Sequence, residues 1–309
     1  MRLAAASLIL LAGSAAAFVP SASDVRPRSP TSLASTLEYD AIIGSGSAVS
    51  ADDFNSKLSA NREKMAAKDK TSKSLGKDDL KVVHEDDQIV VVDKPAGVLS
   101  TPGKDGNPSL QQAVFDAFGC ESGNANKMAC HRLGMDTSGL MIFAKTDAAL
   151  RDLNAQFRTR KVTRKYEALV KGHVADDSGV IDQPLMMDYE NPPYMCISTE
   201  EKQRALIGLS ADDVGKKVLE NPKNSITEYE VIEREEKDGE PVTRLSLTSV
   251  TGRTHQLNVH CVAFGHPIVG DSVYGDAGEG ESMCVHAKSL SFRHPGTREQ
   301  VSLESAAPF

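Results

Sequence analysis

Apolar residues along the chain gather in short runs that predict more strands than helices. β-Branched residues fill 89–92 and a second short apolar run spans 140–144, so both ranges have the pattern of buried strands. Weaker or alternating apolar patterns predict three further strands, at 166–170, 225–232 and 244–250. Helical spacing predicts two helices, over 110–118 and from about Thr146 to Arg160. Since strands and helices do not alternate regularly, we predict an α+β fold with a mixed, mostly antiparallel central sheet and flanking helices.

The residues before the first predicted strand have the pattern of a targeting segment followed by a linker. Residues 1–17 combine a basic start, an apolar run and a small-residue end, as in a removable signal peptide, and the run is too short to span a bilayer comfortably. Residues 18–79 are poor in large apolar side chains, so we predict a transit or linker segment, partly disordered, with one possible helix over 52–70. An ordered domain is expected over 80–309, with an insertion or mobile loop at 199–224.

The charge distribution bears on the class of partner. The 309-residue chain is 40% hydrophobic and 25% charged, as in an ordinary soluble globular protein, and its net charge is −8. An acidic total is unusual for a nucleic-acid binder, because phosphate groups are neutralised by Lys and Arg. Basic residues nevertheless cluster between Lys145 and Lys171, where eight of them stand against three acidic residues, a net charge of +5. This strip fits either a solvated helix face or a track for phosphates.

Neither the cysteines nor the histidines have the spacing of a metal site. The five cysteines are scattered, without a CxxC pair, and predict no disulfide framework and no zinc site. His255, His260 and His266 lie close together, but their spacing does not follow a metal-binding helical motif, and Pro267 interrupts the local structure. We therefore expect no bound metal.

Three separated motifs carry most of the functional information. They are EDDQIVVVDKPAG at 85–97, HRLGMDTSGL at 131–140, and TGRTHQLNVH followed by GHPIVGDSVYG within 251–275. Together they resemble the signature sequences of the RluA-type RNA pseudouridine synthases, and the resemblance extends over roughly residues 80–296. It implies the pseudouridine synthase catalytic fold, a central RNA cleft, and a reaction that needs neither a cofactor nor a metal.

The second motif departs from that family at its most important position. In the family an aspartate directly after His-Arg-Leu is the catalytic residue, and here Gly134 occupies its place. The nearest carboxylate, that of Asp136, is two residues further on. Two residues of extended chain span about 6–7 Å, and displacements of about 1 Å already impair catalysis. Asp136 can replace the missing carboxylate only if the loop folds so as to bring it against Arg253.

The resemblance also implies roles for other residues. Tyr166 would stack on the target base, although a tyrosine here also fits a core position, and Arg253 would pair with the catalytic aspartate, as a buried charge requires. The catalytic candidates are thus Asp136, Tyr166 and Arg253. Gly139, which lacks a side chain, would let the backbone approach a ligand closely. The residues expected to contact RNA are Lys94, His131, Arg132, Arg164, Lys165 and His255. For Lys94, a solvated side chain is the alternative.

These observations leave two functions of different classes. The first is an enzyme that isomerises specific uridines in ribosomal or transfer RNA through a rearranged Asp136. The second is a catalytically silent RNA-binding module or RNA chaperone that keeps the cleft without the chemistry. A small-molecule hydrolase is a remote third interpretation, since the sequence offers no nucleophile–base arrangement. Residues 188–193 resemble a segment of the subgroup that modifies both ribosomal and transfer RNA, except that Pro192 replaces its arginine.

The N-terminus also points to a compartment. Phe18-Val19-Pro20 and a Ser- and Arg-rich stretch follow the apolar run, which is similar to the bipartite presequences of algae with secondary plastids. A secreted or endomembrane location is the alternative, and scattered cysteines favour a reducing compartment. We expect a plastid protein that, once processed, is not bound to a membrane and is a monomer.

Overall fold

The computed structural model describes residues 49–103, 105–278 and 280–309, and all of them belong to a compact unit, Ser47–Phe309. The predicted signal peptide at 1–17 and the plastid-type features that follow it lie outside the described residues. Within the described ranges, no helix is long and apolar enough to cross a membrane.

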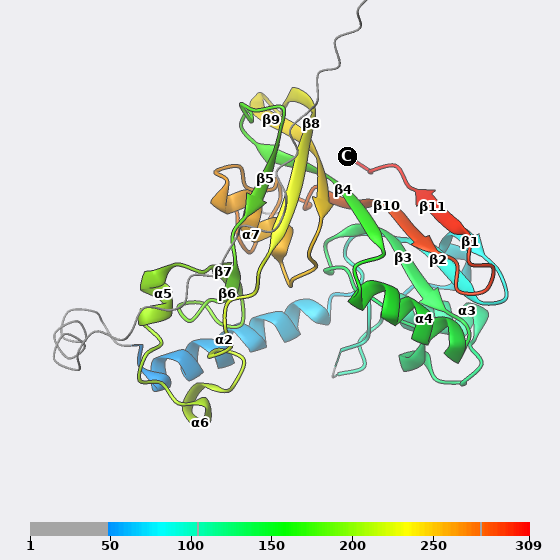
Figure 1. The fold of residues 1–309 in the computed structure, drawn as a ribbon, viewed down its shortest axis with the longest axis horizontal. Helices are drawn as coiled ribbons and strands as arrows, with labels where there is room; N and C mark the ends of the chain where they lie inside the picture. The colour runs from blue at the N-terminus through cyan, green and yellow to red at the C-terminus, as the bar shows by residue number, and fades with distance from the viewer. Residues whose placement is uncertain (1–48, 104, 279) are drawn as a thin grey trace, which may run out of the picture. The chain divides into compact units, whose positions relative to one another are not determined.

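Nine strands form one sheet in the order β1-β2-β3-β10-β4-β9-β8-β5, with β11 paired to β10 (Figure 1). All neighbouring strands are antiparallel except β3 and β10, which run parallel. This arrangement confirms the predicted α+β fold with a mostly antiparallel sheet. Two further strands, β6 and β7, form a separate hairpin. The strands are β1 (Lys81–Glu85), β2 (Ile89–Lys94), β3 (Ser138–Ala144), β4 (Thr163–Lys171), β5 (Ser178–Asp182), β6 (Leu185–Met187), β7 (Met195–Ile197), β8 (Ile226–Lys237), β9 (Glu240–Ser249), β10 (Val285–Arg293) and β11 (Gln300–Glu304).

The two predicted helices form α3 and α4, and each begins after a side-chain cap. The hydroxyls of Ser109 and Thr146 accept the backbone N–H groups of Gln112 and Ala149, which satisfies a donor that the first helical turn leaves free. α4 ends at Arg158, slightly before the predicted end. The described helices are α2 (Ala51–Asp69), α3 (Leu110–Phe118), α4 (Asp147–Arg158), α5 (Glu200–Arg204), α6 (Ala211–Val214) and α7 (Gln256–Ala263), with 3₁₀ turns η1 (Lys77–Asp79) and η2 (Ala125–Lys127).

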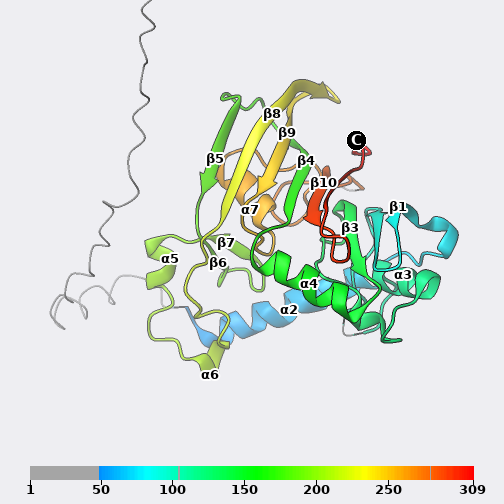
Figure 2. The same ribbon diagram turned by 45° about the vertical axis from the view of Figure 1, so that its right-hand side comes forward.

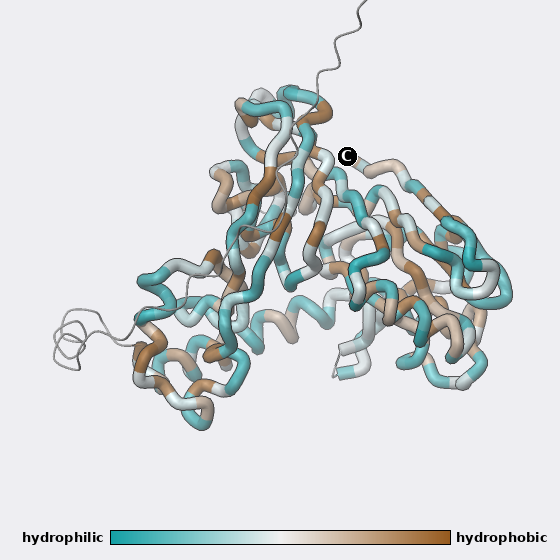
Figure 3. The backbone as a smooth tube through the Cα atoms, in the orientation of Figure 1, coloured by the Kyte–Doolittle hydropathy of each residue, from teal (hydrophilic) through white to brown (hydrophobic). Residues whose placement is uncertain are grey.

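The central strands β2 and β3 are buried on both faces, which explains their unbroken apolar runs. Side chains alternate between the faces of a strand, so one set packs with α4 and the other with α3. The first set is Ile89, Val91, Leu140 and Ile142, and the second is Val90, Val92, Met141 and Phe143. Figure 2 shows both helices beside β3, and brown, hydrophobic segments recur along the strands in Figure 3.

The parallel pair of β3 and β10 depends on a glycine. Gly139 has φ +113°, and a Cβ placed on it would lie 2.4 Å from the backbone nitrogen of Ala287. Gly139 and Ser138 are the residues of β3 that pair with β10. The close backbone approach expected at Gly139 is therefore made by a neighbouring strand and not by a ligand.

Helix α2 forms where one possible helix was expected, over 52–70, but it departs from the linker, partly disordered, predicted for residues 18–79. It occupies Ala51–Asp69, inside the range expected to be a partly disordered linker, so regular structure begins well before residue 80. Phe54 is fully buried and packs against Val214 and Val218 of the 199–224 insertion, which itself contains α5 and α6. Figures 1 and 2 both show one end of α2 beside α6. The apolar partners of Phe54 lie far away in the sequence, so a local pattern around α2 cannot reveal them.

Candidate functional site

A cavity of about 940 Å³ is lined by residues from the second and third motifs and from β4. The loop 131–137 forms one part of its wall, and Tyr166 and Arg253 form others. His131, Tyr166 and Arg253 thus face one cavity although they lie far apart in the sequence. These three residues, predicted from separate motifs, therefore line one candidate site.

Lys94 holds the loop of the second motif in place. Its side chain is fully buried, and its ammonium group donates to the carbonyl oxygens of Met135 at 2.8 Å and Pro95 at 3.0 Å. Burial lowers the pKa of Lys94 to about 7, and the Asp136 carboxylate acts in the opposite direction. The predicted RNA contact of Lys94, and its alternative of a solvated side chain, do not fit this position: the group is used inside the protein to anchor the loop.

Asp136 and Arg253 both line the cavity but have different partners. The Asp136 carboxylate accepts the ammonium group of Lys68, on α2, at 2.5 Å, and its side chain is 32% exposed. The Nε of Arg253 donates to the carbonyl oxygen of Asn224 at 3.2 Å. Within the described residues no ion pair includes Arg253, so the pairing of Asp136 with Arg253 is not made in this structure.

Two buried N–H groups of the cavity wall have no acceptor among the described residues, Nδ1 of His131 and Nε of Arg164. The Nε2 of His131 accepts the amide of Ile142 at 3.1 Å, so the neutral ring carries its proton on Nδ1. Burial, with a smaller effect of Arg164, lowers the pKa of His131 to about 3. The His131 ring stacks on Phe157 at 4.8 Å, and the Arg164 guanidinium lies 5.9 Å from the same ring. Both atoms are inaccessible to solvent, so a ligand oxygen could reach them only if the neighbouring side chains moved, and leaving them unpaired is costly.

β4 separates the predicted RNA-contacting residues onto the two faces of the sheet. Arg164 and Tyr166 line the cavity, and Tyr166 is only 7% exposed because it also belongs to the core. Lys165, between them, lies beside a separate hollow of about 370 Å³ that Glu228 and Glu230 also line. Because strand side chains alternate, Lys165 points away from the cavity, and its predicted contact with RNA bound there does not fit.

The remaining candidates Arg132 and His255 line the cavity, where Arg132 is exposed. The histidines of the third motif have three separate environments rather than a common centre. Their partners are the Tyr274 hydroxyl for His255, the Thr227 hydroxyl and the Gln183 carbonyl for His260, and the Lys171 carbonyl for His266.

Comparisons with known proteins agree with the motifs. The family described as RNA pseudouridylate synthase matches residues 88–263. A dual-specificity RNA pseudouridine synthase RluA, from Pasteurella multocida (strain Pm70), is 38% identical over 236 residues, which cover 74% of this chain and 94% of that protein. The chain belongs to the RNA pseudouridylate synthase family.

A second relative and a solved structure are also similar to this chain. The protein of the same name from Yersinia pestis is 39% identical over 218 residues, 69% of this chain and 92% of that protein. Among solved structures, human RNA pseudouridylate synthase domain containing 1 is similar with a TM-score of 0.60 and 30% identity. That match covers 77% of this chain and 87% of the human one.

Gly134, at the family's aspartate position, is not required by the backbone. It lies on the cavity wall outside the left-handed region, and an added Cβ would meet only the Thr137 side chain, with Oγ1 at 3.2 Å. The Thr137 side chain can rotate away from such a contact. A side chain could therefore be accommodated at residue 134, on the wall of the cavity of this pseudouridylate synthase family member.

Some cavity residues are absent from the sequence candidates, notably Lys68, Tyr194 and Tyr274. Lys68 lies on α2 and Tyr194 precedes β7, both outside the three motifs, so no sequence signal marks them. Tyr274 belongs to the third family motif, and this membership was the one signal that pointed to it.

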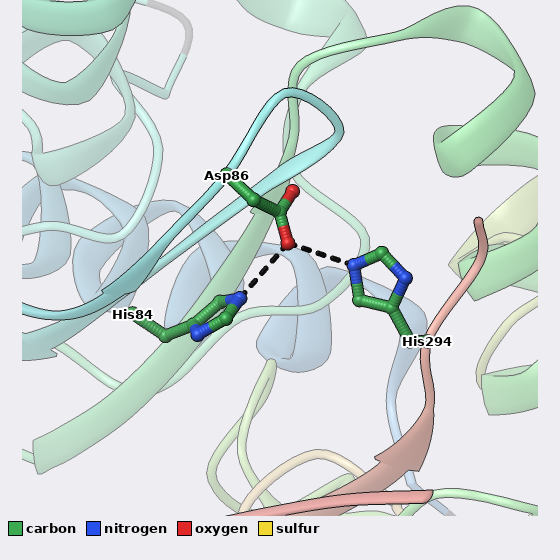
Figure 4. Close-up of side chains that lie close together, drawn as sticks. All are labelled: His84, Asp86 and His294. Carbon is green, nitrogen blue, oxygen red and sulfur yellow. Dashed lines mark hydrogen bonds and ion pairs between the residues drawn. The ribbon is translucent and has the colours of Figure 1, made fainter. Parts of the chain in front are cut away.

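A histidine–aspartate cluster away from the cavity has side chains that could hold a metal ion (Figure 4). The Nε2 atoms of His84 and His294 lie 2.9 and 2.8 Å from Oδ2 of Asp86. The Nδ1 of His294 already accepts the amides of Gly296 and Thr297, so its proton sits on Nε2 and faces Asp86. A metal would need the lone pair at that nitrogen. The cluster therefore fits a hydrogen-bonded link between β1 and the turn after β10.

Proposed function

We propose that this chain isomerises uridine to pseudouridine in RNA, and the cavity that joins the second and third family motifs is the observation that carries the proposal. In this reaction the bond between N1 and C1′ breaks, the base turns, and a bond forms between C5 and C1′. C5 loses a proton and N1 gains one, so no atom is added in total. The chemistry needs a positioned carboxylate at the junction of sugar and base.

The cavity offers a place for each part of a nucleotide that has left its stack. Tyr166 supplies a ring against which the turned-out uracil can rest. Arg164 and the exposed Arg132 both line the cavity and supply positive charge for phosphate or sugar oxygens. Of the six residues that the family resemblance predicts to contact RNA, His131, Arg132, Arg164 and His255 line the cavity and support the proposal by this position.

Asp136 is the carboxylate of the second motif and the group we assign to the chemistry. To reach Arg253 it must leave Lys68, and an ion pair this exposed is worth only about 0–1 kcal/mol. The exchange therefore costs little once RNA enters the cavity. The loop anchor at Lys94 holds the neighbouring Met135 while the Asp136 side chain moves.

A second function has its own support. Gly134 lacks the family carboxylate, and Asp136 is already paired with Lys68. A chain with this site can bind an unstacked uridine without converting it, which is the behaviour of a silent RNA-binding module or RNA chaperone.

Release of tritium from RNA labelled at uridine C5 separates the two functions, because the C5 proton is lost only when the new bond forms. We expect release by the wild type and its loss in Asp136→Asn, which keeps the size of the side chain but removes its basicity. Asp69→Asn, which changes another carboxylate of the cavity wall, is the matched control and should retain release.

Other outcomes are equally informative. RNA binding without release by the wild type, together with release by Gly134→Asp, would establish the silent module. Release that persists in Asp136→Asn would exclude Asp136 as the catalytic group. No RNA binding and no release by any of these variants would reject both functions.

We also propose ribosomal or transfer RNA as the substrate class. The support is that the relatives from Pasteurella multocida and Yersinia pestis are named dual-specificity RNA pseudouridine synthases. Labelled ribosomal RNA and unmodified transfer RNA, assayed in parallel, provide the test. Release from neither, with release from another RNA class, would contradict the assignment.

For its place in the cell we propose the plastid, after removal of the N-terminal targeting segment, and a monomer that is not membrane-bound. The support is the signal-like run followed by Phe18. A fluorescent protein fused after residue 79 should enter plastids, and Phe18→Ala should retain it outside them. Sedimentation of the processed protein tests the monomer.

A further inference from the structure

Three aromatic side chains gather in one part of the cavity wall, and we call them the aromatic cluster: Tyr194, His255 and Tyr274. The ring of Tyr194 lies 6.2 Å from His255 and 6.1 Å from Tyr274, and His255 and Tyr274 are 5.4 Å apart, all between centroids. Among the described residues, no ring pair joins Tyr166 to this cluster. The cavity therefore contains a second aromatic surface besides the one assigned to the target base.

Two members of the aromatic cluster are fixed by hydrogen bonds. The Tyr274 hydroxyl accepts the amide of Met195 at 3.0 Å and is hydrogen-bonded to Nδ1 of His255 at 2.6 Å. Burial lowers the pKa of His255 and raises the pKa of Tyr274, so both rings are neutral at pH 7.

The backbone of His255 is in an unusual conformation, with φ 54° and ψ 20°. A residue other than glycine in this left-handed region costs on the order of 1–3 kcal/mol and persists where surrounding contacts hold it, often at functional sites. The hydrogen bond to Tyr274 is such a contact. The strain thus places the His255 ring on the cavity wall.

The chemistry of the aromatic cluster favours a neutral ring over a phosphate group. The buried carboxylate of Asp271 lies close enough to affect the pKa of both His255 and Tyr274, and its negative charge opposes an anion. Asp271 is occupied by the amides of Val273 and Tyr274 and by the side chain of Asn258. Neutral aromatic side chains are the usual stacking partners of unpaired bases in RNA.

Tyr194 is the member of the cluster that remains available to stack on a ligand. Its ring is half-buried, and within the described ranges its hydroxyl has no hydrogen-bonding partner. A cavity of about 940 Å³ is near the upper end of the range of about 300–1,000 Å³ typical of small-ligand pockets. It therefore has room for more than the target base.

We infer that the aromatic cluster is a subsite for an unpaired nucleobase adjacent to the target uridine, with Tyr194 as its stacking residue. The inference rests on the proposed function in that the ligand is RNA. It adds a second base contact, beside the target uridine.

The absence of tryptophan from the chain allows a direct test. Tyr194→Trp introduces a single indole, whose fluorescence a stacked base should quench when the protein is titrated with a hairpin RNA that has one uridine in its loop. Tyr189→Trp is the matched control, because Tyr189 lies in the same segment but does not line the cavity. We expect quenching in the first variant and not in the second.

Matched hairpins that lack the base on the 5′ or the 3′ side of the uridine identify the stacked nucleotide. Removing one of these two bases should abolish the quenching and weaken binding by about 5- to 150-fold, since stacking is worth about 1–3 kcal/mol per base. Tyr194→Phe, which keeps the ring, should retain the wild-type affinity. Tyr194→Leu should lose affinity by the same factor as removal of the base.

The outcomes separate this subsite from the proposed function. Quenching that survives loss of either base, equal affinities of the Phe and Leu variants, or RNA binding without quenching would each overturn the subsite while leaving the proposed function intact. No RNA binding by the wild type, measured on filters, would remove both. Tritium release by the wild type is scored independently, so a silent wild type whose Tyr194→Trp variant is still quenched would support the subsite alone.

Discussion

Gly134 and Gly139 belong to one motif, yet the fold treats them in opposite ways. At Gly139 a Cβ would lie 2.4–2.7 Å from backbone atoms of Ala287, and φ is +113°. At Gly134 a Cβ would meet only the Thr137 side chain. Gly139 is thus required by the packing between β3 and β10. Gly134 is not required by packing, and its lack of a carboxylate alters the chemistry of the cavity. One part of the motif therefore fixes the pairing of β3 with β10, and another part lines the cavity.

A buried polar network strengthens the contrast. Ser138 Oγ lies 2.9 Å from Nδ1 of His286, whose Nε2 lies 3.1 Å from Ser305 Oγ, and that hydroxyl donates to Asp93 at 2.5 Å. Ser138 is 5% exposed and does not line the cavity, so this network fixes the pairing of β3 with β10 and is not a nucleophile–base site. The loop of Gly134, by contrast, exposes Asp136 at the cavity.

The largest effect is expected from Gly139→Ala. The added methyl group collides with the backbone of β10, and the left-handed φ adds strain, so we expect a loss of about 3–5 kcal/mol of unfolding free energy or no folded protein. Denaturant titration measures it. Gly134→Ala, as the control, should change stability by less than about 1 kcal/mol. Equal losses in the two variants would remove the contrast.

Gly134→Asp is expected to act on chemistry instead of stability. In a wild type that lacks a working carboxylate, as in the silent module, a carboxylate at the family position should raise tritium release by about 10²–10⁴-fold, the usual contribution of a positioned acid or base. A wild type that is already active through Asp136 should gain much less. Gly134→Asn, which has the same shape without the charge, should give no increase. A folded Gly134→Asp protein with unchanged release would show that the cavity lacks more than one carboxylate.

Lys94, which anchors the loop, should make the stability of the protein depend on pH. The pKa of Lys94 is about 7 in the folded protein and about 10.5 in the unfolded chain, so between these values the unfolded state binds more protons. Wild-type stability should therefore rise, relative to Lys94→Met, as pH increases from 7 to 10, by up to about 1.4 kcal/mol per unit. Denaturation at several pH values measures this. A constant difference between the two proteins would contradict the lowered pKa.

The smallest effect is expected at the solvent side of the loop. Lys68→Met should change stability by less than about 1 kcal/mol because the pair with Asp136 is exposed, and it should raise tritium release by up to about fivefold because Asp136 is freed. Lys57→Met, which breaks an exposed pair with Asp53 on the same helix, is the control and should leave release unchanged. A fall in release would show that Lys68 assists the reaction.

Much of the fold could be predicted because its signals are local. The apolar runs of β2 and β3 and the capped starts of α3 and α4 depend on neighbouring residues, and each was predicted close to its observed bounds. Helix α7 was not predicted: it begins after His255, whose side chain makes no capping hydrogen bond, so the usual start signal is missing. Helix α2 needed its contact with α6 to bury Phe54.

By itself the sequence determined the fold class, the family and the loss of the aspartate at residue 134, because patterns and motifs reside in consecutive residues. Only the tertiary structure decided that Lys94 is an anchor, that Lys165 lies on the opposite face from the cavity, and that Lys68 holds Asp136. These roles depend on burial and on partners distant along the chain. Burial and pairing arise when the strands and helices pack, so no local pattern contains them.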